Sequence, residues 1–226
     1  TERLRKAGLI VNEGKIMDAS IVHAPVQHIR AKENDQLDKG RKPRGWNKHK
    51  VRQKDTDATW TKKHGKSYFG YKNHTKVDAK SKLIETYVAT TASEADGNMV
   101  GKLLSEGDRG QRMDADKGYD WQSVRDDLAA LEMDDQVMEK ARRGRPLGRK
   151  QKRANKARSR VRARVEHVYG QITRRFDGHR LRCIGFGRAN HQIGLTNLLY
   201  NMLRSIFLLP PTFVGSGKAR KIAELA

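Results

Sequence analysis

Three acidic residues, far apart in the chain, have side chains suited to metal-assisted chemistry. Asp18 lies inside an apolar, strand-like run, and Asp116 directly follows another such run. Glu166 lies within a long, very basic segment that has helical periodicity. Carboxylate oxygens are the ligands that Mg²⁺ and Mn²⁺ prefer, and two such ions about 3.5–4 Å apart can act on a phosphodiester. One interpretation of the trio is therefore a two-metal site for phosphoryl transfer.

A simpler interpretation exists for the glutamate. Arg162 precedes Glu166 by one helical turn, which is the spacing of an ordinary surface ion pair worth only about 0.3–0.5 kcal/mol. Asp114 is also a rival to Asp116, because residues two apart on a strand share a face. From spacing and charge alone, these alternatives stay open.

The charge of the chain indicates a nucleic-acid partner. Its 226 residues carry a net charge of +22, and no acidic residue occurs between Glu139 and Glu166. A second basic region spans 30–63. Neutralising phosphates releases counterions and drives association, so we expect nucleic-acid binding. The expected DNA contacts are Lys72, Arg142, Arg143, Arg145, Lys150, Arg153, Arg158, Arg162 and Arg174.

The remaining composition limits the compartment. No apolar run approaches the roughly 18 residues of a membrane span. A single cysteine, Cys183, excludes an intrachain disulfide and a zinc site built from several cysteines. We therefore expect a cytoplasmic protein associated with nucleic acid and not with a membrane.

The order of expected elements favours a mixed α/β sheet flanked by helices. We predict strands at 16–22, 112–115 and 136–138, a β-hairpin over 66–91, and helices at 95–106, 120–131, 156–176 and 190–208. Between them, 26–64 is expected to be a basic, partly disordered insertion and 140–158 a basic loop. One domain would span 1–209, followed by a flexible tail at 210–226.

The helix expected over 156–176 shows how the glutamate could reach a site. Its apolar stripe consists of Val161, Val165, Val168 and Ile172. Arg162, Glu166 and Tyr169 follow the same spacing, turned by about 100° around the helix axis. If the stripe packs on the sheet, the face bearing Arg162 and Glu166 lies at its margin.

Several motifs occur together in a fixed order. They are 18–25 (DASIVHAP), 68–74 (YFGYKNH), 116–119 (DKGY), 162–170 (RARVEHVYG) and 198–202 (LLYNM). In this order they resemble the bacterial insertion-sequence transposases of the DDE type, in the group around insertion sequence five. The resemblance covers roughly residues 7 to 208.

The resemblance implies a ribonuclease H-like core in which Asp18, Asp116 and Glu166 bind two Mg²⁺ or Mn²⁺ ions. It implies a DNA transposase that cuts the terminal inverted repeats of an element and transfers the strand into target DNA, as a homodimer when two ends are held together. The alternatives are a nuclease or resolvase on the same core, and a truncated remnant that only binds DNA.

The family signature around the glutamate is matched in part. Arg162 and Glu166 match it, whereas Ser159 stands at its tyrosine position and Thr173, next to Arg174, stands at its lysine position. The family also carries a helical domain before the first aspartate. Because 17 residues precede Asp18, most of that domain is expected to be missing.

Overall fold

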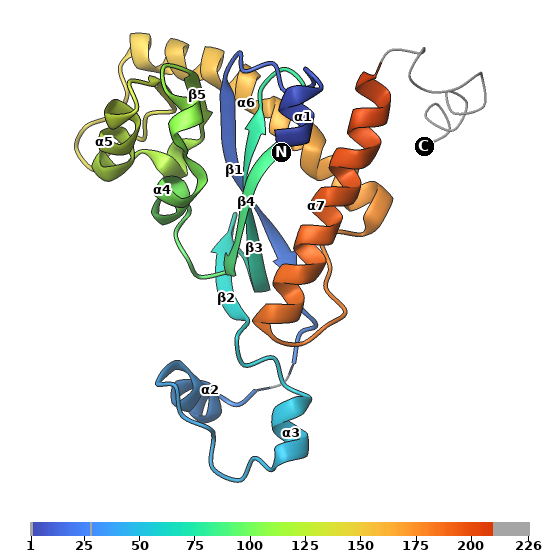
Figure 1. The fold of residues 1–226 in the computed structure, drawn as a ribbon. Coiled ribbons are helices and arrows are strands. Elements are labelled where there is room, and N and C mark those ends of the chain that lie inside the picture. Colours follow the sequence, from blue (N-terminus) through green and yellow to red (C-terminus); the bar gives the residue numbers. More distant parts are fainter. Residues whose placement is uncertain (1, 28, 210–226) are drawn as a thin grey trace.

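A six-stranded sheet forms the centre of the protein, in a computed structural model that describes residues 2–27 and 29–209 (Figure 1). Its strands are β1 (Lys15–His23), β2 (Thr59–Lys63), β3 (Lys66–Asp78), β4 (Ile84–Thr91), β5 (Arg112–Ala115) and β6 (Asp134–Val137). The order across the sheet is β2-β3-β1-β5-β6, and β4 also pairs with β3. The tail predicted at 210–226 lies outside the described residues.

The sheet is mixed, as predicted. β3 pairs antiparallel with β1 and with β4. The pairing of β3 with β4 confirms the hairpin expected over 66–91. β1–β5 and β5–β6 pair in parallel. The long strand β3 changes partner along its length, since residues 66–70 pair with β2 and 71–77 with β4. The first part of β3 and β2 therefore form an arm of their own.

Helices pack on both faces of the sheet. The helices of the described residues are α1 (Glu2–Lys6), α2 (Ala31–Asp38), α3 (Lys48–Arg52), α4 (Val100–Leu103), α5 (Gln122–Ala130), α6 (Arg149–Phe176) and α7 (Phe186–Leu208), with short 3-10 turns η1 (Asp96–Met99), η2 (Glu106–Asp108) and η3 (Lys117–Tyr119). Of these, α2 and α3 lie beyond the end of the sheet (Figure 1). α4 and α5 pack on one face, and α6 and α7 pack on the other (Figure 1). This is the predicted ribonuclease H-like arrangement.

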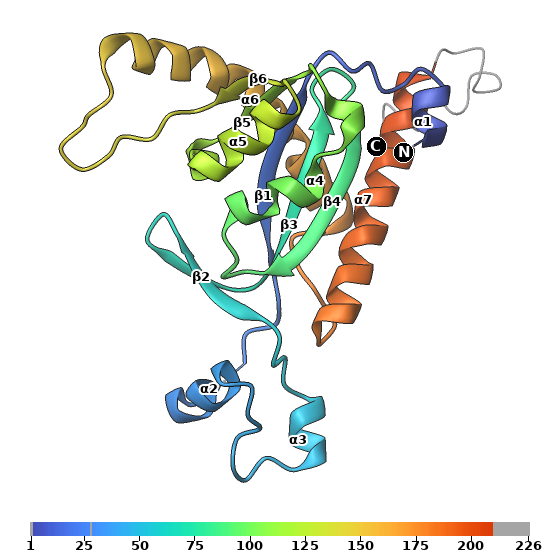
Figure 2. The same cartoon turned by 60° about the vertical axis from the view of Figure 1, so that its left-hand side comes forward.

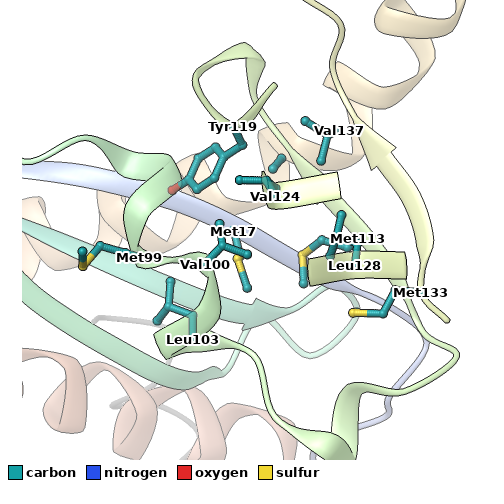
Figure 3. Packing of buried hydrophobic residues seen from close by; sticks show 11 residues of the cluster. Met17, Met99, Val100, Leu103, Met113, Tyr119, Val124, Leu128, Met133 and Val137 are labelled. Atoms are coloured by element: carbon teal, nitrogen blue, oxygen red, sulfur yellow. The ribbon is translucent and has the colours of Figure 1, made fainter. Parts of the chain in front are cut away.

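The alternation of side chains along β1 sets the direction of Asp18. Met17 packs into the cluster formed with α4 and α5 (Figure 3), whereas Ile16 packs against Val165 and Val168 of α6. Because successive side chains point to opposite faces of a strand, Asp18 shares the face of Ile16. The first aspartate is thereby directed towards the helix that carries the glutamate.

Two segments predicted to be loops contain regular structure. Within 26–64 the chain forms α2, α3 and strand β2, and Trp46 is buried with its indole Nε1 donating to Glu33 Oε1 at 2.7 Å. The β-branched and aromatic residues of Thr59–Lys63 suit a strand, and β3 supplies its partner. Within 140–158, α6 begins at Arg149 rather than at Lys156, because alanine, lysine and arginine are strong helix formers.

α7 is apolar on both of its faces. It buries Ile193 and Tyr200 against the sheet and leaves Leu198, Met202 and Phe207 exposed on its outer side. Among the described residues, no helix has both the length and the hydrophobicity needed to cross a membrane.

Candidate active site

The two aspartates emerge side by side because their strands are parallel neighbours. Met17 of β1 pairs with Ala115 of β5, so the residues that follow them, Asp18 and Asp116, lie next to each other. Local backbone amides hold each carboxylate. Ala19 N–H donates to Asp18 Oδ1 at 2.8 Å, and Gly118 N–H donates to Asp116 Oδ1 at 2.7 Å.

Helix α6 brings the glutamate to the same place. The predicted stripe packs on the sheet, and Arg162 Nη1 donates to Asp18 Oδ2 at 2.9 Å while its Nη2 donates to Glu166 Oε1. Asp18, Asp116 and Glu166 all line one cavity of about 630 Å³. The structure therefore gathers all three predicted acids around one cavity, with the Arg162 guanidinium between two of them.

The environment of Asp18 disfavours its ionised form. The side chain is only 13% exposed, and burial raises the pKa of Asp18 to about 6 from its ordinary 3.8. The hydrogen bond from Ala19 and the charge of Arg162 oppose this rise in pKa, whereas the charge of Asp116 adds to it. A second cation beside these carboxylates would lower the pKa of Asp18 and stabilise the charged form.

Two tyrosines lie close to Asp18, one half-buried (Tyr169) and one fully buried (Tyr119). The Tyr169 hydroxyl donates to the Asp18 carbonyl oxygen at 2.8 Å and accepts from Thr75 Oγ1 at 2.7 Å. Tyr119 is buried, and its hydroxyl has no hydrogen-bond partner in the described part of the chain. Burial, and after it the charge of Asp18, raises the pKa of both phenols well above the ordinary value. Both tyrosines therefore remain neutral beside the acids.

Sequence reasoning gave neither tyrosine a role, although signals for both were present. Tyr169 has the helical spacing of Arg162 and Glu166, and Tyr119 ends the motif that begins with Asp116. Both positions could have been identified by asking which side chains share a face, or a turn, with the acids.

Asp114 has a separate partner. Its carboxylate accepts two hydrogen bonds of 2.7 Å from Arg112 and is buried. It is absent from the lining of the cavity, which includes Asp116. Of the two rivals, only Asp116 faces the cavity.

The predicted DNA-contact residues divide into exposed and internally bonded groups. Six of them are exposed, all in the loop before α6 or on α6 itself: Arg142, Arg143, Arg145, Lys150, Arg153 and Arg174. Arg142 and Arg145 line a second cavity of about 600 Å³, which Arg158 also borders. These exposed side chains have the freedom that contact with phosphates requires.

Three of the predicted contacts are instead bonded within the protein. Lys72, with its side chain only 13% exposed, donates to Asp96 Oδ1 at 2.9 Å and to the Glu94 carbonyl oxygen at 2.6 Å. Arg158 donates to the Val137 carbonyl oxygen at 3.0 Å, and Arg162 bonds Asp18. Lys72 and Arg158 were expected at the surface because a sequence does not show which basic residues have an internal acceptor.

The cavity also receives residues that the sequence did not indicate. Lys63 and His64, at the tip of the β2–β3 arm, line it together with Lys117. Ser159, at the signature position expected to hold tyrosine, borders it as well. The interpretation of 26–64 as a loop concealed the contribution of the arm.

The mixed sheet has one aspartate on β1, a second directly after the neighbouring parallel strand β5, and a glutamate on the helix across them. This arrangement places the chain in the ribonuclease H-like class. Within that class, a sequence model of the transposase DDE domain matches residues 13–202, most of the chain, and the protein belongs to this family. No solved structure matches the chain.

Proposed function

We propose that this protein is a DNA transposase of an insertion sequence, in the group around insertion sequence five. It cuts the ends of its element and joins them to target DNA. The observation that carries the proposal is the convergence of Asp18, Asp116 and Glu166 on one cavity. In a basic chain of the transposase DDE domain family, this placement favours phosphodiester chemistry over a chance surface ion pair.

The three acids fit divalent cations in the type of their donor atoms. Mg²⁺ and Mn²⁺ prefer carboxylate oxygens, and these are present on Asp18 of β1 and on Asp116, directly after the adjacent strand β5. In the described ranges, no three His, Cys, Asp or Glu side chains are grouped closely enough to hold one ion together. Arg162 bonds both Asp18 and Glu166, so the glutamate must leave this arginine to join the aspartates.

Asp18, Asp116 and Glu166 are the residues that would hold the ions, expected to be two. When bound, such ions stabilise the charge that develops on the attacking and leaving oxygens. Other groups of the protein hold the two aspartates in position. Tyr169 fixes the backbone of Asp18, and the Gly118 amide orients Asp116. Once Glu166 moves away, the Arg162 guanidinium can bond a phosphate in its place.

The proposed reaction consists of two substitutions at phosphorus. In the first, water adds to the phosphorus at the element end, the bond to the 3′ oxygen breaks, and that oxygen leaves as a hydroxyl. In the second, this 3′-hydroxyl attacks a target phosphodiester and displaces the 3′ oxygen of the target strand. Each step exchanges one phosphorus–oxygen bond for another, so neither a redox partner nor a covalent enzyme intermediate is required.

The test uses a plasmid that carries the DNA flanking this gene, incubated with a second plasmid as target and with Mg²⁺ or Mn²⁺. Joined products that the wild type makes and Asp116→Asn does not make support the proposal. Cleavage without joining indicates a nuclease or resolvase, and binding without cleavage indicates a DNA-binding remnant. Sedimentation of the protein with two end fragments tests the expectation that two copies hold two ends.

A further inference from the structure

The β2–β3 arm ends in a tight and well-defined turn. Lys63 pairs with Lys66, and the two residues between them, His64 and Gly65, have φ values of 51° and 77°. Two left-handed residues in a two-residue hairpin are typical of a type I′ turn, whose twist matches the strands that it joins. Figure 2 shows the arm projecting from the sheet on the same side as the loop before α6. The arm is therefore a regular β-hairpin and not an irregular loop.

The tip of this arm, residues 62–66, is strongly basic. Its side chains Lys62, Lys63, His64 and Lys66 are exposed, and none forms a hydrogen bond or ion pair with another described residue. By contrast, Lys72 and Lys76 further along β3 each bond a carboxylate. Lys63 and Lys66 lie directly opposite each other on the two strands, and like charges in such positions destabilise a strand pair. A negatively charged partner from outside the protein would remove this cost.

The position of the tip indicates which partner this is. Lys63 and His64 border the cavity of the three acids, which Ser159 and Arg162 of α6 border as well. Lys63 is close enough for its charge to act on Asp18. The cavity is thus lined by the three acids, by basic side chains of the arm and by Arg162 of α6. A phosphodiester placed at the acids has neighbouring phosphates on either side, and those phosphates need cations.

We propose that the tip of the β2–β3 arm clamps the DNA backbone beside the scissile phosphate. The inference rests on the proposed function, because that function places DNA over the acids. It assigns to residues 62–66 a role in holding the strand that is cut, separate from that of the basic residues on α6.

The test compares two variants that lose the same charge. The tip variant is Lys62→Ala/Lys63→Ala/Lys66→Ala, and the control is Lys6→Ala/Lys80→Ala/Lys102→Ala, which alters exposed lysines elsewhere. Binding to a duplex of arbitrary sequence is measured in EDTA over a range of salt concentrations. Each lost phosphate contact makes the slope of log K against log salt shallower by about 0.9. We expect a change of about 2–3 for the tip variant, with binding weakened at least about tenfold, and a much smaller change for the control.

Melting temperature separates the clamp from a fault in folding. The tip variant should melt at the wild-type temperature or slightly above it, because its like charges no longer repel. Equal binding by the tip and control variants overturns the clamp, even if the wild type cuts and joins DNA. If the wild type binds DNA without metal-dependent cleavage, the proposed function fails and the clamp beside a scissile phosphate fails with it, while a shallower slope in the tip variant still shows that the tip contacts phosphates.

Discussion

Replacing Asp18 by asparagine should stabilise the protein when no metal is added. Burial raises the pKa of Asp18 from 3.8 to about 6, a value that already includes the attraction of Arg162. Each unit is worth about 1.36 kcal/mol, so ionising this carboxyl at neutral pH costs the folded state about 3 kcal/mol. The amide of asparagine has nearly the same shape and no charge, but its single oxygen can accept from only one of Ala19 and Arg162, and the lost hydrogen bond offsets about 1 kcal/mol. We expect Asp18→Asn to gain about 1–2 kcal/mol.

The effect has a defined dependence on pH. The pKa of Asp18 is higher in the folded state than in the unfolded state, so its favourable contribution is complete below about pH 4. It is lost as the pH rises through about 6. The advantage of Asp18→Asn should therefore be large at pH 7.5 and nearly absent at pH 4. For a chain of this size, each kcal/mol raises the melting temperature by about 2–4 °C.

The assay is thermal unfolding in EDTA at both pH values. Asp127→Asn serves as the control, because it removes a carboxylate from an exposed position on α5. Its melting temperature should stay close to that of the wild type at either pH. A variant Asp18→Asn that is no more stable than the wild type at pH 7.5 would falsify the reasoning, as would an advantage that persists at pH 4. Added Mg²⁺ should raise the melting temperature of the wild type more than that of the variant.

Other changes separate chemical from structural roles. Glu166→Gln should alter stability by less than about 0.5 kcal/mol, since this side chain is 59% exposed, yet abolish metal-dependent cleavage; unaltered cleavage would restore the surface ion-pair interpretation. Arg158→Ala should lower the free energy of unfolding by about 1–3 kcal/mol through its lost bond to Val137, whereas Arg153→Ala should mainly make the salt dependence of DNA binding shallower. Gly70→Ala should destabilise by at least about 2 kcal/mol in chemical denaturation, because φ is 151° and the added Cβ would collide with backbone atoms of Val22 and Ala24; a near-neutral result would contradict the close strand approach.

The site was predictable from sequence where a short pattern determines the geometry. The alternation around Asp18 and the helical spacing of Arg162 and Glu166 define which way those side chains point, whatever the rest of the fold. Neighbouring positions for Asp18 and Asp116 also required a parallel β1–β5 pair, which motif order implied only through the family resemblance. The placement of the acids around one cavity follows from these features together.

The surface residues were less predictable because their partners lie far away in sequence. Lys72 carries the same charge as Arg153, yet its ammonium group donates a hydrogen bond to Asp96 while Arg153 stays exposed. Strand β2 was not predicted from the sequence, because a strand of five residues gains its stability from pairing with β3. Charge and local preference are properties of a segment, whereas burial and pairing depend on the whole fold.

The helix that carries Glu166 is tied to the sheet at both of its ends. Near its start, Asn155 exchanges hydrogen bonds with the backbone of Glu139, just after β6. Beyond its end, the chain pairs with the last residue of β1, as the amide of Leu181 donates to the carbonyl of His23 at 2.8 Å. Because these contacts hold both ends of α6, the connecting segments 140–148 and 177–180 can change in length without moving the acids. Segment 140–148, which joins Glu139 to the start of α6, is therefore one place where the chain can change in length while the carboxylates stay in position.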